Sequence, residues 1–312
     1  MSRAIVFAYH NVGVRCFSVL LAHGVEVLRV VTHKDSPTET IWFDSVAELA
    51  ARHGIPVITP EDPNDPAVVA ELAALQPDFL FSFYYRLMLK APLLALPKRG
   101  AYNMHGSLLP KYRGRVPVNW AIIHGERETG ATLHEMVEKP DAGGILAQQA
   151  VPILPDDTAF EVFNKVTLAA EMALDRVLPD LLAGRTLAKP QNLATGSYFG
   201  GRKAEDGRID WTQPASRVHN LIRAVAPPYP GAYSDTAKGR LRVLRSLHPT
   251  LETGPCGGHP TLFVRNGHLY AECGDGRLLR LLAVELDGLP LAPESAGDQL
   301  NAILGTPALS LS

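Results

Sequence analysis

The chain has 312 residues, of which 46% are hydrophobic and 20% charged, a composition that supports a folded core and excludes a disordered chain. Its formal charge of −2 lacks the basic excess typical of nucleic-acid-binding proteins. No apolar run approaches the roughly 18–20 residues that span a bilayer, and the N-terminus has no signal-peptide pattern. The three cysteines, Cys16, Cys256 and Cys273, form no disulfide framework. These properties predict a cytoplasmic protein of about two domains.

Short apolar runs alternate with helical periodicity through the first third of the chain. The expected strands are 4–9, 25–32, 56–58, 79–83 and 101–104, and the expected helices are 14–22, 45–53 and 66–75. Strands separated by helices of this size indicate a parallel sheet covered on both faces. The predicted fold class is therefore α/β, with a Rossmann-like, mostly parallel sheet.

The rest of the chain changes character near residue 190. Two expected strands, 132–137 and 145–151, precede a long helix that begins with capping-box spacing between Thr158 and Glu161. Polar, turn-rich sequence follows, and beyond it short strands alternate with Asn-Gly and Asp-Gly turns. The expected organisation is a catalytic domain at 1–190, a linker at 191–205, and a small β-rich domain at 206–304.

Several common catalytic and nucleotide-binding motifs are missing from the sequence. No G-x-G-x-x-G follows the first strand, and neither a P-loop nor a G-x-S-x-G motif occurs. No histidine spacing is typical of a zinc site, so no metal is expected.

A cluster of polar residues lies where the strand at 101–104 ends. Asn103 and His105 are two residues apart, so on extended backbone their side chains point to the same face, and Asp141 follows in a turn. An amide, an imidazole and a carboxylate suit acyl transfer: the carboxylate orients the imidazole, the imidazole moves a proton, and the amide stabilises an oxyanion. A single histidine after a strand is more often structural, and an Asp before Ala-Gly-Gly is commonly a turn former. Spacing alone leaves both interpretations open.

The longer motifs around these residues resemble those of the folate-dependent formyltransferases. The matching segments are Asn-Met-His-Gly-Ser-Leu-Leu-Pro-Lys-Tyr-Arg-Gly-Arg at 103–115, Met-Val-Glu-Lys-Pro-Asp-Ala-Gly at 136–143, Gly-Arg-Ile-Asp-Trp at 207–211, and the helix around Asn220. The resemblance covers almost the whole chain. It implies that Asn103, His105 and Asp141 are catalytic, that 10-formyltetrahydrofolate is the co-substrate, and that the second domain is barrel-like.

The resemblance also implies binding residues. The donor would contact Leu87, Met88 and Leu89 together with Val137, Glu138, Lys139, Pro140 and Asp141. The acceptor would contact Arg115, with Tyr84, Tyr85 and Trp120 as walls of its site. Judged from the residues alone, the leucines are more typical of packing and the aromatic residues of the core. Arg115 fits a solvated surface charge and a substrate-binding arginine equally well.

Finer features resemble the family members that formylate the 4-amine of UDP-4-amino-4-deoxy-L-arabinose in lipid A modification and polymyxin resistance. These features are the segments 7–13, 82–86 and 116–120, and the stretch 32–40, which has no basic run of the kind that holds tRNA. The expected partners are a nucleotide-linked amino sugar and folate, without nucleic acid. In those relatives a decarboxylase domain is fused, so here it is expected on a separate chain.

Three alternatives stay open at this point. The acceptor can be another nucleotide-linked 4-amino sugar, such as a dTDP-linked one. The chain can be an initiator methionyl-tRNA formyltransferase, which its charge disfavours. It can also be a folate-binding protein without activity, which the complete set of Asn103, His105 and Asp141 disfavours.

Overall fold

The computed structural model describes residues 2–37, 41–236, 239–291 and 308–310. The chain divides into two compact units, each built from more than one segment. The first contains 1–117, 128–151 and 164–200, and the second contains 118–127, 152–163 and 201–312. The domain limits expected from composition stay a prediction.

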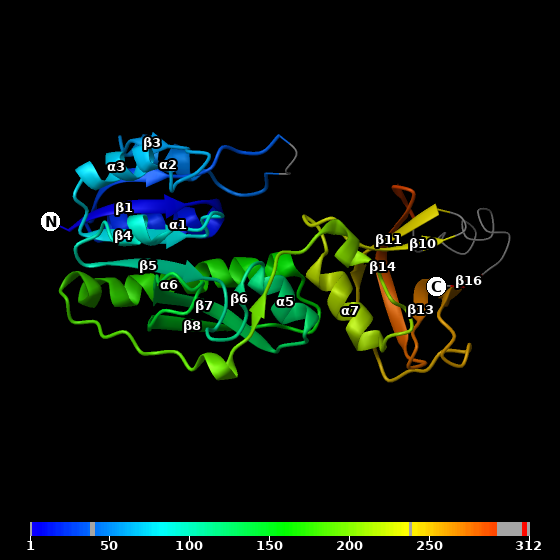
Figure 1. Cartoon of the computed structure of the whole chain (residues 1–312). Coiled ribbons are helices and arrows are strands. Elements are labelled where there is room, and N and C mark those ends of the chain that lie inside the picture. The colour runs from blue at the N-terminus through cyan, green and yellow to red at the C-terminus, as the bar shows by residue number, and fades with distance from the viewer. Residues whose placement is uncertain (1, 38–40, 237–238, 292–307, 311–312) are drawn as a thin grey trace. The chain divides into compact units, whose positions relative to one another are not determined.

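The first unit is built on a seven-stranded sheet. Its strands are β1 (Arg3–Ala8), β2 (Glu26–Val31), β3 (Val57–Ile58), β4 (Phe79–Phe83), β5 (Gly100–His105), β7 (Glu128–Glu135) and β8 (Ile145–Pro152). Their order is β3-β2-β1-β4-β5-β7-β8, which Figure 1 shows from β3 near the top to β8 near the bottom. The pairs from β3 to β5 are parallel, whereas β5 and β7 are antiparallel.

Helices cover both faces of this sheet. They are α1 (His10–Ala22), α2 (Val46–Arg52), α3 (Pro66–Ala74), α4 (Ala91–Leu94) and most of α6 (Ala159–Leu182). Ile5 and Phe7 of β1 pack with Leu72 of α3 and Leu93 of α4. On the other face, Gly13 of α1 approaches Ala8 closely, leaving little room for a side chain. The predicted Rossmann-like fold class is confirmed.

Two short strands in this unit have no counterpart in the sequence-based expectation. They are β6 (Arg113–Gly114) and β9 (Tyr198–Phe199), which pair in parallel. β9 lies inside the stretch expected to be a linker, and its pairing ties that stretch back to the first unit. Strands of two residues have no periodicity to detect, which explains why the pattern missed them.

The second unit contains an antiparallel sheet that packs against an amphipathic helix. The strands are β10 (Ala232–Thr236), β11 (Gly239–Ser246), β12 (Thr261–Arg265), β13 (His268–Glu272), β14 (Leu278–Leu286), β15 (Leu289–Pro290) and β16 (Ala308–Ser310). The main path runs β10-β11-β14-β13-β12-β16. The helix α7 (Ala215–Ala224) packs Val218 and Ile222 into a core centred on the fully buried Trp211. This confirms the expected β-rich second part.

Three short helices complete the structure: α5 (Pro117–Ile123) and the 3₁₀ turns Leu193–Thr195 and Ala204–Gly207. The sequence patterns did not predict α5, which begins at Pro117. Within the described ranges, no helix has the length and apolar character needed to cross a membrane.

Candidate functional site

The candidate site begins at the end of β5, in the first unit. Asn103 and His105 lie on one face of this strand, as their spacing predicted. The antiparallel register places His134 of β7 opposite Asn103, and Thr132 opposite His105. Because directly paired residues share a face of the sheet, four polar side chains gather here.

The ring of His105 is buried, with one nitrogen hydrogen-bonded and the other facing Asp141. Nε2 lies 2.8 Å from the carbonyl oxygen of Tyr112, so Nε2–H donates to that carbonyl. Nδ1 lies 3.6 Å from Oδ1 of Asp141, which is beyond hydrogen-bond length. The Tyr112 carbonyl therefore holds the proton on Nε2, and the carboxylate faces the other nitrogen.

Asp141 reaches the histidines from the turn between β7 and β8. Its backbone is left-handed, with φ 52°, and its Oδ2 accepts a hydrogen bond of 2.8 Å from the Gly114 N–H. Burial acts to raise the pKa of Asp141, but His105, His134 and the Gly114 N–H outweigh it and hold that pKa well below its usual range. The carboxylate is therefore ionised at neutral pH.

The backbone of β6 and of Tyr112 before it binds both His105 and Asp141. On one edge, Arg113 N–H donates to Ser197 O and Arg115 N–H donates to Phe199 O, which attaches β6 to β9. On the opposite edge, Tyr112 C=O accepts from His105 and Gly114 N–H donates to Asp141. Because alternate peptide groups of an extended strand point to opposite edges, two residues of β6 suffice for this arrangement.

His134 is the residue of this site that sequence reasoning did not assign. It is 2% exposed, and its Nε2 lies 3.1 Å from Nδ2 of Asn103 and 3.5 Å from Oδ1 of Asp141. Its Nδ1 lies 2.7 Å from the carbonyl oxygen of Glu135. The sequence alone could not indicate this role, because the pairing of His134 with Asn103 depends on the register between β5 and β7.

Thr132 supports the loop that follows β5. Its hydroxyl donates to Ser107 O at 2.6 Å and accepts from the Leu109 N–H at 3.2 Å and from Gln148 Nε2 at 2.9 Å. The Ser107 hydroxyl donates to Lys111 O at 2.7 Å, a bond within the loop that is typical of a turn residue. These bonds fix the loop that connects His105 to β6.

The residues expected to contact the donor divide into two groups. Leu87, Met88 and Val137 are 41%, 55% and 45% exposed, so their apolar side chains face outward. Leu89 is instead buried in the core beside Leu93, and Met136 packs on the same cluster. The segments 87–89 and 136–137 therefore border the same part of the unit. Glu138 and Lys139 are exposed, and Pro140 is half-buried.

The four residues expected on the acceptor side have different surroundings. The Tyr84 hydroxyl lies over Gly106, where a Cβ would come within 1.9 Å of it. Tyr85 stacks on His33, and burial raises the pKa of Tyr85 to about 12. Trp120 belongs to the second unit, where Arg202 covers its ring at 4.8 Å. Arg115 is exposed.

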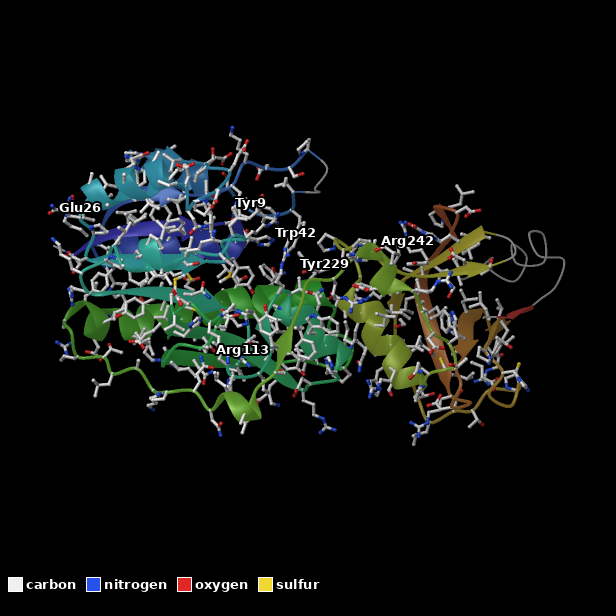
Figure 2. The ribbon with its side chains drawn as sticks, in the orientation of Figure 1. Tyr9, Glu26, Trp42, Arg113, Tyr229 and Arg242 are labelled. Carbon is white, nitrogen blue, oxygen red and sulfur yellow. The ribbon has the colours of Figure 1, made fainter. Side chains whose placement is uncertain are left out.

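Arg113 is a further charged residue that sequence reasoning did not single out. It is 8% exposed, yet its Nε is buried without a hydrogen-bond partner among the described residues. Arg113, which is labelled in Figure 2, lies on β6 between the two peptide groups that bind His105 and Asp141. A buried guanidinium with an Nε–H that has no hydrogen-bond partner is suited to bind an anionic group of a ligand.

An aromatic cluster lies at the carboxyl ends of β1, β2 and β4. The Tyr9 hydroxyl donates to Asp35 at 2.8 Å, and the guanidinium of Arg86 lies 4.6 Å from the Tyr9 ring. His10 contacts the Trp42 ring edge to face at 4.5 Å; Tyr9 and Trp42 are labelled in Figure 2. Segments 7–13 and 82–86 thus meet at the sheet edge where open α/β folds bind ligands.

Across the described residues, no group of three or more His, Cys, Asp or Glu side chains is arranged to hold a metal ion.

Comparison with known proteins assigns most of the chain to family models. Residues 18–178 match the model described as formyl transferase, and residues 202–294 match formyl transferase, C-terminal domain.

Three solved structures illustrate the similarity in fold. An N-formyltransferase from Helicobacter canadensis, in complex with folinic acid and dTDP-3-aminofucose, is 22% identical, covers 90% of this chain and 99% of its own, and has a TM-score of 0.70. A 4-N formyltransferase from Francisella tularensis is 23% identical over 76% of this chain and 93% of its own, with a TM-score of 0.63. HypX from Aquifex aeolicus, in complex with tetrahydrofolic acid, is 20% identical over 97% of this chain and 47% of its own, with a TM-score of 0.64.

Proposed function

Because the chain belongs to the formyl transferase family, we propose that it transfers a formyl group from 10-formyltetrahydrofolate to the 4-amine of UDP-4-amino-4-deoxy-L-arabinose. The observation that supports this most is the convergence of Asn103, His105 and Asp141 on one face of the β5 edge. The three groups supply an amide donor, an imidazole and an ionised carboxylate. Formyl transfer needs these groups.

The proposed chemistry requires one oxyanion to be stabilised and one proton to be moved. Formyl transfer to an amine develops negative charge on the formyl oxygen and carries a proton from the amine to the departing nitrogen. Asn103 donates from Nδ2 to that oxygen. His105 holds and moves the proton at Nδ1, since Nε2–H is committed to Tyr112 O. Asp141, ionised and 3.6 Å from Nδ1, stabilises the ring when it is positively charged.

The residues around the site fit a flat, partly apolar donor. Leu87, Met88 and Val137 offer exposed apolar side chains close to backbone that is not part of a helix or strand. The Tyr85 hydroxyl is buried without a hydrogen-bond partner among the described residues, as is Arg113 Nε. We assign the pterin to the apolar residues and an anionic substrate group to Arg113.

The acceptor is proposed from the sequence motifs together with the charge. The segments 7–13 and 82–86, which meet in the aromatic cluster, resemble the enzymes of lipid A modification. The stretch 32–40 has no basic run, and the chain has a net charge of −2, which favours a sugar nucleotide over tRNA.

A second acceptor class has direct support. The Helicobacter canadensis protein was crystallised with dTDP-3-aminofucose, a dTDP-linked amino sugar. A dTDP-linked acceptor is therefore the main alternative, ahead of methionyl-tRNA and of folate binding without transfer.

A formyl-transfer assay tests the proposal. Purified protein and 10-formyltetrahydrofolate are incubated separately with UDP-4-amino-4-deoxy-L-arabinose, dTDP-linked 3-amino and 4-amino sugars, initiator methionyl-tRNA, and no amine. We expect turnover of the UDP-linked sugar, with the highest kcat/KM of the set. Preference for a dTDP-linked sugar or for tRNA would contradict the proposed acceptor. Donor binding without turnover of any amine would contradict formyl transfer to these acceptors.

A further inference from the structure

His134 and Asn103 form a cross-strand pair within the candidate site. They are directly opposite in the β5/β7 register, and Asn103 Nδ2 lies 3.1 Å from His134 Nε2. His134 is 2% exposed and Asn103 is half-buried, so this contact is partly shielded from water. A hydrogen bond between two side chains of adjacent strands is well placed to fix the orientation of both.

The protonation of His134 follows from its second nitrogen. Nδ1 is 2.7 Å from the Glu135 carbonyl oxygen, which can only accept, so Nδ1 carries a hydrogen and donates it. In the neutral ring Nε2 is then an acceptor, and it takes one of the two Nδ2 hydrogens of Asn103. Nε2 also lies 3.5 Å from Asp141 Oδ1, a longer contact than the 3.1 Å to Asn103 Nδ2.

We propose that His134 is a positioning residue that holds the Asn103 amide with its N–H side toward the reacting formyl group. This inference rests on the proposed function of the site. The amide of an asparagine can turn by 180°, and its carbonyl would then face the developing negative charge. An acceptor at Nε2 favours the orientation in which Nδ2 faces His134, which leaves the second Nδ2 hydrogen for the oxyanion.

Two substitutions separate this role from simple packing. His134→Gln retains a carbonyl acceptor near the position of Nε2, whereas His134→Leu has a similar size and no acceptor. For the wild type, both variants, Asn103→Ala, and the His134→Leu, Asn103→Ala double variant, kcat and KM are measured with the best acceptor. We expect His134→Leu to lower kcat by about 10–100-fold with little change in KM, and His134→Gln to stay within about fivefold of the wild type.

The double variant decides whether His134 acts through Asn103. If it does, His134→Leu lowers kcat by less than about twofold once Asn103 is alanine. An equal loss in both backgrounds would overturn the proposal, as would equal activity of the Leu and Gln variants. If His134→Leu does not fold, failure of His134→Gln to retain activity would be the contradicting result.

A measurement that needs no substrate tests the same contact. Nitrogen NMR of the ¹⁵N-histidine-labelled protein reports which ring nitrogen carries the hydrogen. We expect His134 to be the Nδ1–H form, with an Nε2 signal that moves in Asn103→Ala. An Nε2–H form, or an unmoved signal, would overturn the proposal. Should no amine be turned over, the proposed function fails, while the NMR result still decides the pairing of His134 with Asn103.

Discussion

At the scale of single residues, the most specific prediction concerns Asn103. Its side chain is tied to His134 and supports no other described element, so Asn103→Ala should leave the fold intact. Loss of one oxyanion donor typically costs about 100–1,000-fold in kcat. We expect that loss in the formyl-transfer assay, with an unchanged melting temperature. Met104→Leu, on the opposite face of the same strand, is the matched control and should retain full activity. An unfolded Asn103→Ala would instead make Asn103 structural.

The buried His219 on α7 leads to a prediction about how stability depends on pH, which is independent of the catalytic site. It is 1% exposed; Nε2–H donates to Pro155 O, and Nδ1 lies 2.8 Å from the Ser246 hydroxyl. Burial lowers the pKa of His219 to about 4, and the nearby Arg223 and His248 also lower it. The Pro155 carbonyl and Asp156 act in the opposite direction but are outweighed.

Because the folded-state pKa is the lower one, the unfolded chain binds the extra proton between about pH 6.5 and 4. Stability should therefore fall as pH is lowered through that window, by up to about 3 kcal/mol. Hydrogen exchange of peptides covering α7 at pH 7 and pH 5 would measure this loss. We expect His219→Gln to flatten the pH dependence. An equal slope in that variant would assign the effect to other groups.

At the scale of elements, the pairing of β6 with β9 carries the geometry of the site. Gly114 has φ +97°, and a Cβ there would lie 2.2 Å from the Phe199 carbonyl oxygen. Gly114→Ala should therefore separate the two strands and disturb the bonds to His105 and Asp141. We expect a fall in kcat of at least about tenfold, because small displacements of catalytic groups are costly.

Gly200→Ala is the matched control for this prediction. Gly200 follows β9 directly, and a Cβ there would meet no atom within 4 Å. The control should have wild-type kcat and melting temperature. If both alanine variants keep full activity, the pairing of β6 with β9 is not needed to hold the site.

The same elements explain how far the sequence could predict the site. Asn103, His105 and Asp141 were found because two lie on one strand and the third lies in a recognisable motif. His134 was missed because its role depends on the register between β5 and β7, which are joined through β6 and α5. The contacts of Tyr112 and Gly114 are made by backbone atoms, which no side-chain pattern reports. The Rossmann-like sheet, by contrast, followed from buried strands with strong periodicity.

At the scale of the whole molecule, the charge distribution makes a prediction about salt. The chain has 30 Lys and Arg against 32 Asp and Glu, and many arginines of the described residues are already paired with carboxylates, such as Arg15 with Glu171 and Arg240 with Asp235. A tRNA acceptor would need several unpaired cations, and its binding would weaken steeply as those contacts are screened. A sugar nucleotide carries only a diphosphate, so its binding needs few cationic contacts.

We therefore expect kcat/KM for the sugar nucleotide to change by less than about tenfold between 50 and 200 mM salt, since few phosphate contacts are involved. A protein that makes 6–10 phosphate contacts loses about 10³–10⁵ in affinity over the same range. Initial rates at subsaturating acceptor, with the donor saturating, measure the slope. Arg113→Met should raise KM for the substrate that carries the anionic group and leave the melting temperature unchanged or higher, because a buried Nε–H without a hydrogen-bond partner among the described residues is removed. A steep salt dependence that persists in Arg113→Met would indicate an extended polyanionic acceptor and contradict the sugar-nucleotide assignment.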